Sequence, residues 1–385
     1  MTALPLDGTT AVARTQALVI GAGPAGLAVG ACLRRAGVPF RILEAGEQIG
    51  TSWHIHYHRL HLHTVKRYST LPFMPFPPEV PRYPSRQQVL AYLETYAERF
   101  DLQPSFRRPV TSAHFDNGEW QVHTPAGAYR ARYLVICTGS NRDPIIPRWG
   151  GEEGFGGRIL HSVEYRTGEP FRGRRVLVVG MGNTGAEIAL DLCQHEADTS
   201  IAVRSGVNIV PRDALGIPIQ VLSILSSQVK PQFTDAVTRS LWRRLIGDLH
   251  PLGLATPPYG PTMSVVTLGR IPVIDVGTVR KLQGGHVRVH GQIARFTANG
   301  VEFVDGREER FDTVVLATGF RPAIGSFLTQ ADQVTDARGY PMAHGRRTSL
   351  PGLYFCGFHI VSTGLLREIG REARRIARDI KEQAV

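Results

Sequence analysis

The hydrophobic pattern of the N-terminal part predicts a strand, a helix and a second strand in succession. An apolar run at 17–20 is short and continuous, as in a parallel strand that is buried on both faces. Residues 27–35 follow as a helix rich in small side chains, and a second apolar run at 40–43 ends at Glu44. The turn after the first strand consists of Gly21, Ala22, Gly23, Pro24, Ala25 and Gly26. This order of elements is typical of a dinucleotide-binding unit.

Each glycine of this turn has an expected role in cofactor binding. Gly21 allows the tight turn, Gly23 lets the backbone approach a pyrophosphate, and Gly26 lets the helix pack closely on the strand. The N-terminus of the helix then faces the phosphates, so Pro24 and Ala25 belong to the same expected site.

The same pattern recurs in the middle of the chain. A strand is predicted at 175–179, a helix at 186–194 and a second strand at 200–203. The turn between the first two consists of Gly180, Met181, Gly182, Asn183, Thr184 and Gly185. We therefore expect an α/β fold with two Rossmann-like domains, each with a dinucleotide site.

The residues that follow the second strand of each unit differ in charge. The carboxylate of Glu44 can accept hydrogen bonds from ribose hydroxyls but would repel a 2′-phosphate. Arg204 and Ser205 stand at the corresponding place of the second unit, where a guanidinium can pair with a 2′-phosphate in bidentate fashion. The first site therefore suits FAD and the second suits NADPH. A solvated cation at a strand end is the alternative interpretation of Arg204.

Two further predicted strands, at 133–137 and 313–317, each end in a threonine and a glycine. These pairs let the chain cross closely beneath a cofactor, and they are Thr138 with Gly139 and Thr318 with Gly319. Antiparallel patterns with tight-turn signals precede them, at 114–120 and 294–303. We expect these small antiparallel sheets to join the two nucleotide domains.

The length of 385 residues fits two domains. We expect an FAD-binding domain made of 1–165 and 285–385, and an NADP-binding domain made of 166–284. Residues 206–262 are rich in proline and have an irregular pattern, apart from a helix candidate at 234–250. A substrate-access lid and an ordinary packed insertion are both open interpretations of this segment.

The composition is that of a globular protein and narrows the choice of partners. Hydrophobic residues make up 42% of the chain and charged residues 20%. The net charge of +11 is spread along the chain, without basic runs interleaved with aromatics, so we expect no nucleic-acid partner.

The four cysteines form no C-x-x-C pair, and targeting patterns are weak. We expect a cytoplasmic protein with no membrane partner, and we leave a homodimer open.

One short segment is rich in histidine, with His54, His56, His58, His61 and His63. Such spacing can present metal ligands along a strand. No acidic residue or cysteine accompanies these histidines, so we expect no bound metal.

Several motifs identify a family. The run from Phe155 to Tyr165 matches the pattern F-x-G-x-x-x-H-x-x-x-W/Y just before the second glycine turn. Shorter matches are Trp53, 59–63, 71–77, 203–205 and 317–320. With these motifs, nearly the whole chain resembles the flavin-containing monooxygenases, and most closely the plant YUCCA-type enzymes and their bacterial relatives.

The resemblance implies a reaction cycle. NADPH reduces FAD, dioxygen adds to give a C4a-hydroperoxyflavin, and one oxygen atom passes to a small organic substrate. The substrate is either a soft nitrogen or sulfur centre or, as in YUCCA-type enzymes, a 2-oxo acid such as indole-3-pyruvate that undergoes oxidative decarboxylation. The alternatives are a Baeyer-Villiger monooxygenase, an FAD- and NADPH-dependent reductase without oxygen transfer, and a nucleotide-binding protein that consumes no NADPH. The missing C-x-x-C argues against a disulfide reductase.

The resemblance also implies site residues. His63 falls where mammalian-type members carry an asparagine that contacts the flavin and where YUCCA-type members carry histidine. We therefore expect His63 to bind the flavin edge or the nicotinamide as a catalytic residue, with a structural role as the alternative. His161 is expected to be a structural histidine near the domain junction. Further cofactor contacts are expected at Trp53, His61, Val110 and Gly357.

Overall fold

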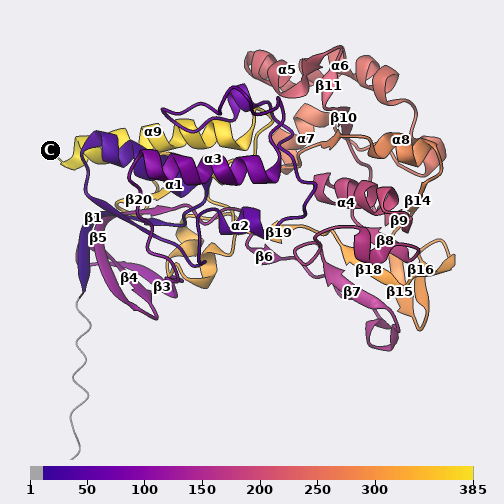
Figure 1. Cartoon of the computed structure of the whole chain (residues 1–385), viewed down its shortest axis with the longest axis horizontal. Coiled ribbons are helices and arrows are strands. Elements are labelled where there is room, and N and C mark those ends of the chain that lie inside the picture. The colour runs from indigo at the N-terminus through magenta and orange to yellow at the C-terminus, as the bar shows by residue number, and fades with distance from the viewer. Residues whose placement is uncertain (1–11, 385) are drawn as a thin grey trace, which may run out of the picture.

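The computed structural model describes residues 12–384 and contains two units, each built on its own main sheet (Figure 1). The units lie side by side along the long axis of the molecule. The chain crosses from the first unit to the second at β6 (Asp143–Pro144) and returns at β19 (Phe320–Arg321). These two short strands pair with each other in antiparallel fashion, so the two crossings lie together.

The first sheet contains β1 (Ala13–Ile20), β2 (Phe40–Leu43), β3 (Ser112–Asp116), β4 (Glu119–Thr124), β5 (Gly127–Ile136) and β20 (Leu353–Phe355). The strand order is β2-β1-β5-β4-β3, and β20 also pairs with β5. The pairs of β1 with β2, β1 with β5 and β5 with β20 are parallel, whereas β3 and β4 extend the sheet in antiparallel fashion.

Three helices cover one face of the first sheet, and they are α1 (Pro24–Ala36), α3 (Arg86–Arg99) and α9 (Leu365–Ala384) (Figure 1). Side chains alternate along β1, because Ala17 and Val19 pack under the helices while Leu18 and Ile20 pack on the opposite face in the same cluster as Trp120. Burial on both faces explains why the apolar run of this strand is continuous.

The second sheet contains β7 (Arg158–His161), β8 (Arg175–Val179), β9 (Asp198–Ala202), β14 (Val287–His290) and β18 (Thr313–Leu316). The strand order is β14-β9-β8-β18-β7, and every pair is parallel. Helices α4 (Asn183–Gln194) and α8 (Thr278–Gln283) cover one face. An antiparallel sheet covers the other, and its strands are β15 (Ile293–Thr297), β16 (Gly300–Phe303) and β17 (Glu308–Arg310).

The α/β fold class with two Rossmann-like units is confirmed, but sheet membership corrects the expected domain limits. β7 lies within 1–165, and β14 and β18 lie within 285–385, yet all three belong to the second sheet. An apolar run indicates that a strand is buried and does not specify its neighbours in a sheet. The antiparallel segments expected to join the domains each belong to one unit, and the β6–β19 pair makes the joint instead.

Residues 206–262 were expected to be irregular apart from a helix at 234–250, and α6 (Pro231–Ile246) covers most of that range. The rest of the segment is more regular than expected, because it also contains α5 (Ile219–Leu225) and the start of α7 (Pro261–Leu268). Pro231 and Pro261 are the first residues of their helices, where the missing N–H removes no helical hydrogen bond. The proline-rich pattern therefore marked helix starts.

The remaining short elements are β10 (Ile209–Pro211), β11 (Asp213–Ala214), β12 (Ile217–Pro218), β13 (Val273–Asp275), α2 (Thr51–His54), and the 3₁₀ turns η1 (Lys66–Tyr68), η2 (Glu152–Gly154), η3 (Glu169–Phe171), η4 (Ser226–Gln228), η5 (His250–Leu252), η6 (Ile324–Ser326) and η7 (Ala331–Gln333). Among residues 12–384, no helix combines the length and the apolar character needed to cross a bilayer.

Candidate active site

The first glycine turn, between β1 and α1, is crowded on one side and open on the other. Gly21 has a φ of +107°, and a Cβ atom there would lie 2.6 Å from the carbonyl oxygen of Cys137. A Cβ atom on Gly26 would lie 1.8 Å from the carbonyl oxygen of Gly21. Gly23 has a φ of −79°, and its Cβ position meets no atom within 4 Å. The backbone around Gly23 is therefore accessible to a ligand.

The open side of this turn fits the phosphates of a dinucleotide. No side chain caps the N-terminus of α1, so its first backbone N–H groups remain available for an anionic group. Thr138 follows Cys137 beneath the turn, and its buried hydroxyl makes no hydrogen bond to any described residue. Gly357, with a φ of +85°, also approaches closely, because a Cβ there would lie 2.9 Å from the Cβ of Ala25.

The carboxylate of Glu44 accepts two backbone hydrogen bonds, one of them from the same turn. The N–H of Ala22 donates to Oε2 at 2.7 Å, and the N–H of Gly46 donates to Oε1 at 2.8 Å. Each carboxylate oxygen can accept a further hydrogen bond, so these contacts leave Glu44 able to bind a ribose hydroxyl.

The second glycine turn, between β8 and α4, repeats this geometry. Gly180 has a φ of +100°, and its Cβ position lies 2.8 Å from the carbonyl oxygen of Ala317. The Cβ position of Gly185 lies 1.9 Å from the carbonyl oxygen of Gly180, whereas that of Gly182 meets no atom within 4 Å. The N-terminus of α4 also has no side-chain cap. The second turn therefore fits a dinucleotide for the same reasons as the first.

The two threonine–glycine pairs are divided between the turns. Thr138 and Gly139 lie beneath the first turn, whereas Thr318 and Gly319 follow β18 beneath the second. Thr318 had been grouped with the FAD-binding domain, so its placement is a correction that follows from the sheet order. Its hydroxyl donates to the carbonyl oxygen of Ile145 at 2.5 Å.

Asn183 and Thr184 have different surroundings. The side chain of Asn183 donates to the carbonyl oxygen of Pro272 at 3.2 Å and accepts from the N–H of Ile274 at 2.7 Å. Asn183 therefore ties α4 to β13, and Thr184 lines a pocket. Arg204 and Ser205 follow β9 and are exposed; the guanidinium of Arg204 makes no ion pair within residues 12–384.

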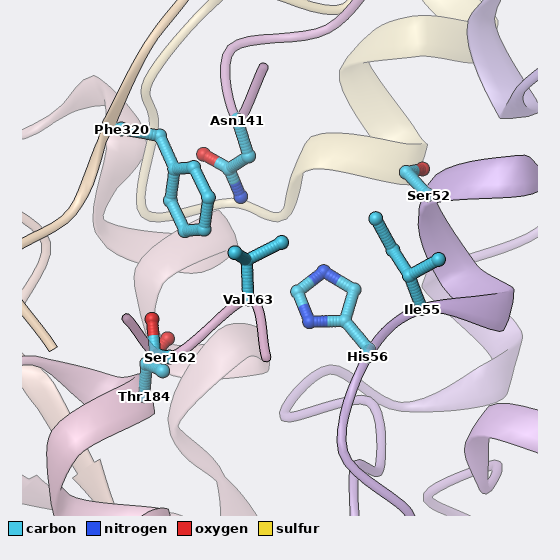
Figure 2. Close-up of a pocket in the computed structure, with 8 residues that line it drawn as sticks. All are labelled: Ser52, Ile55, His56, Asn141, Ser162, Val163, Thr184 and Phe320. Atoms are coloured by element: carbon cyan, nitrogen blue, oxygen red, sulfur yellow. The ribbon is translucent and has the colours of Figure 1, made fainter. Parts of the chain in front are cut away.

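A small pocket, with a cavity volume of about 20 Å³, lies between the two units (Figure 2). Figure 2 shows Ile55 and His56 on one side, and Val163 and Phe320 across from them. The hydroxyl of Ser162, from the second unit, is buried and makes no hydrogen bond to any described residue. The full lining consists of Ser52, Ile55, His56, Asn141, Ser162, Val163, Thr184 and Phe320.

His56 is the titratable residue of this pocket. Burial lowers the pKa of its imidazole, and the positive charges of Arg166 and Arg86 lower it further, against an opposing effect of Glu187. The imidazole is therefore neutral near pH 7, with one ring nitrogen able to accept a proton.

The other histidines of the segment point to different places. The Nε2 atom of His63 lies 2.7 Å from Oε1 of Glu187 on α4, and His63 does not line the pocket. The Nδ1 atom of exposed His61 lies 2.6 Å from the carbonyl oxygen of Arg59. Within residues 12–384, no group of three or more histidine, cysteine or acidic residues converges as metal ligands would.

Two other expected contacts lie away from the pocket lining. The ring of Trp53 packs edge-on to His56, with ring centroids 6.5 Å apart, and also packs against the apolar core of the first unit. The side chain of Val110 is buried in the apolar cluster of the first sheet.

Of the eight lining residues, only Thr184 was among the expected cofactor contacts. Asn141 and Phe320 closely follow the threonine–glycine pairs, and this proximity was the available sequence signal. His56 and Ser162 reach the pocket through the association of the two units, which no local pattern encodes.

The structure has two glycine turns whose geometry fits dinucleotides and a pocket between its two units, and known proteins are similar to the chain. Residues 18–215 match the family described as pyridine nucleotide-disulphide oxidoreductase. Indole-3-pyruvate monooxygenase YUCCA4 of Oryza sativa subsp. japonica is 39% identical over 99% of this chain and 91% of its own length. Probable indole-3-pyruvate monooxygenase YUCCA7 of Arabidopsis thaliana is 42% identical over 82% of this chain and 76% of its own length.

Solved structures agree with these relatives. A mutant flavin monooxygenase from Stenotrophomonas maltophilia superposes with a TM-score of 0.77 at 27% identity, covering 97% of this chain and 100% of that chain. The chain therefore belongs to the YUCCA-type flavin-dependent monooxygenases, within the pyridine nucleotide-disulphide oxidoreductase family. It is an oxidoreductase whose cofactors are FAD and NADPH, and its co-substrates are dioxygen and a small molecule.

Proposed function

We propose that the first glycine turn binds FAD and the second binds NADPH. Glu44 beside the first turn suits the ribose hydroxyls of FAD, since its carboxylate would repel a 2′-phosphate. Arg204, exposed at the end of β9, suits the 2′-phosphate of NADPH. The residues proposed to contact the cofactors also include Gly23, Ala25, Thr138, Gly139 and Gly357 for FAD, and Gly182, Thr184, Thr318 and Gly319 for NADPH.

The proposed reaction is the oxidative decarboxylation of a 2-oxo acid such as indole-3-pyruvate, the substrate named for the plant relatives. One atom of dioxygen becomes bonded to the carbonyl carbon, the C–C bond between the carbonyl and carboxyl carbons breaks, and carbon dioxide leaves. The other oxygen atom becomes water, with the hydride of NADPH and a proton supplying the reducing equivalents. When bound, the flavin supplies the redox chemistry between NADPH and dioxygen.

The observation that carries this proposal is the pocket between the two units. Thr184 brings the start of α4 to the pocket, and His56 and Asn141 bring the first unit to the same place. Ile55, Val163 and Phe320 give part of the pocket apolar walls, which favour the exclusion of water that a reactive oxygenating site requires. Ser162 and neutral His56 supply hydrogen-bonding groups, and His56 can hold a proton at one ring nitrogen.

Two further points belong to this proposal. We place the protein in the cytoplasm without a nucleic-acid partner, and the four cysteines, all free in the structure, support a reducing compartment. A homodimer is also proposed, and sedimentation of the FAD-loaded protein tests it.

Product analysis over a substrate panel tests the proposed function. The FAD-loaded protein is incubated with NADPH and air, and with indole-3-pyruvate, a ketone, a sulfide or an amine. We expect indole-3-acetate and carbon dioxide from the 2-oxo acid, formed with NADPH consumption. An ester or lactone from the ketone alone would establish a Baeyer-Villiger enzyme. A sulfoxide or N-oxide alone would establish oxygenation of soft centres.

A further inference from the structure

A row of polar side chains on α4 faces the 57–63 segment, which directly follows the pocket-lining residues Ile55 and His56. Glu187, Asp191 and Gln194 are spaced by four and three residues, so they share one face of the helix. Glu187 and Asp191 are only 3% and 5% exposed. A buried carboxylate needs close partners, because an unpaired buried charge is strongly unfavourable. The partners of the two carboxylates come from different parts of the chain.

Within residues 12–384, Glu187 is held by side chains of the 57–63 segment. The hydroxyl of Tyr57 donates to Oε1 at 3.2 Å, and the Nε2 atom of His63 lies 2.7 Å from the same oxygen. This segment belongs to the first unit in sequence, yet Tyr57 packs in the apolar core of the second unit. Glu187 therefore holds the segment against α4.

Asp191 is held mainly by its own unit. The hydroxyl of Tyr165 donates to Oδ2 at 2.6 Å, and the N–H of Gly168 donates to the same oxygen at 2.8 Å. Arg59 approaches Oδ1 at 4.0 Å and donates to Oε1 of Gln194 at 2.5 Å. Asp191 thus fixes α4 within the second unit, whereas Glu187 links α4 to the first unit.

The two segments that Glu187 joins, the start of α4 and the chain at 56–63, each contribute a residue to the pocket lining. Thr184, three residues before Glu187 on α4, lines the pocket next to the second glycine turn. His56, which directly precedes Tyr57, lines the pocket from the first unit. One carboxylate therefore connects the helix that fits the nicotinamide dinucleotide to the pocket wall carried by the first unit.

We propose that Glu187 is a positioning residue which, through Tyr57 and His63, couples binding of NADP(H) at the second turn to the placement of the pocket wall at 54–56. This inference rests on the proposed assignment of NADPH to the second turn. It also gives His63 a role beside the flavin contact expected from the sequence. In this inference His63 acts on the site through the carboxylate of Glu187.

The test is titration of the oxidised FAD-bound protein with NADP⁺ in the absence of substrate. NADP⁺ bound beside the flavin changes the flavin absorption spectrum, so the titration gives both a Kd and an amplitude at saturation. Glu187→Gln retains size but removes the negative charge. We expect it to keep FAD, to raise the Kd for NADP⁺ by about two- to thirtyfold, and to lower the spectral amplitude at saturation.

Two further variants examine the link itself. His63→Gln and Tyr57→Phe should change the Kd and the amplitude in the same direction as Glu187→Gln. In the Glu187→Gln background, His63→Gln should add little, because both changes remove the same contact. Glu196→Gln is the matched control, since this carboxylate lies just beyond α4 in an exposed ion pair with Arg172 at 3.2 Å. The control should behave as wild type.

The outcomes separate the inference from the function on which it rests. If wild-type protein binds no NADP⁺, the proposed assignment fails and the inference fails with it. If the wild type responds but Glu187→Gln and His63→Gln retain its Kd and amplitude, the inference alone is overturned. A lowered Tm with unchanged NADP⁺ binding also overturns it, because Glu187 would then only stabilise the fold. If Glu187→Gln does not fold, Tyr57→Phe and His63→Gln decide by the same criteria.

Discussion

The carbonyl oxygen of Gly21 lies only 1.8 Å from the position that a Cβ atom on Gly26 would occupy. The second turn repeats this approach between Gly180 and Gly185, at 1.9 Å. The outer glycines of each turn are thus required by the fold itself. The middle glycine of each turn faces open space, so its lack of a side chain matters only to a bound ligand.

This difference leads to a prediction for Gly23→Ala. The variant should fold normally, since the φ of −79° suits any residue and the added methyl meets no protein atom. A methyl forced against a bound pyrophosphate disfavours binding by about 1–3 kcal/mol, or roughly one to two decades in Kd. Reconstitution of apoprotein with FAD, followed by flavin fluorescence, measures the change. Gly26→Ala is the contrasting variant and should fail to fold, because its added methyl would overlap the carbonyl oxygen of Gly21. If Gly23→Ala bound FAD with wild-type affinity, the first turn would not be the FAD site.

Gly182→Ala provides the matching prediction for the second turn. The variant should retain FAD and a wild-type Tm, because the Cβ position of Gly182 is also open. The KM for NADPH should rise by about one to two decades, for the same steric reason. Steady-state kinetics and the FAD content of the purified protein measure the two effects. Loss of FAD with an unchanged KM for NADPH would reverse the proposed assignment of the turns.

Arg204→Ala should discriminate between the two nicotinamide coenzymes. Loss of a charge-assisted contact to the 2′-phosphate removes about 1.5–3 kcal/mol, which raises the KM for NADPH by about one to two decades. The KM for NADH should be nearly unchanged, since NADH lacks this phosphate. Arg172→Ala, in an exposed ion pair of the same unit, is the control. An equal rise in the KM for NADPH and for NADH would show that Arg204 supports the fold and does not contact the phosphate.

The buried imidazole of His344 should make the free energy of unfolding depend on pH in the acidic range. Burial, aided by the charges of His359 and Arg346, lowers the pKa of its imidazole to about 4. An unfolded histidine has a pKa near about 6.5, so between these values only the unfolded chain binds the proton. Stability should therefore fall as the pH drops from about 6.5 toward about 4. His344→Gln should make this dependence shallower in urea unfolding experiments at several pH values, and an unchanged dependence would contradict the assignment.

Local features of the fold were predictable from the sequence, and long-range pairings were not. The glycine turns and the strands that precede them follow from short patterns, and the structure places both turns as expected. The pairing of β18 with β7 and β8 joins distant parts of the chain, and no residue within β18 specifies it. The partner of His63 lies 124 residues away on α4, so a resemblance in one segment could not reveal Glu187. Similarly, Pro231 and Pro261 suggested irregular chain until their positions at helix starts were known.

Isotope labelling tests the central claim most directly. The FAD-loaded protein is supplied with NADPH, ¹⁸O₂ and indole-3-pyruvate, and the products are analysed by mass spectrometry. We predict indole-3-acetate that carries one ¹⁸O atom in its carboxylate, formed in a one-to-one ratio with the NADPH consumed. Consumption of NADPH with hydrogen peroxide as the only oxygen product, and no label in any organic product across the substrate panel, would contradict a monooxygenase.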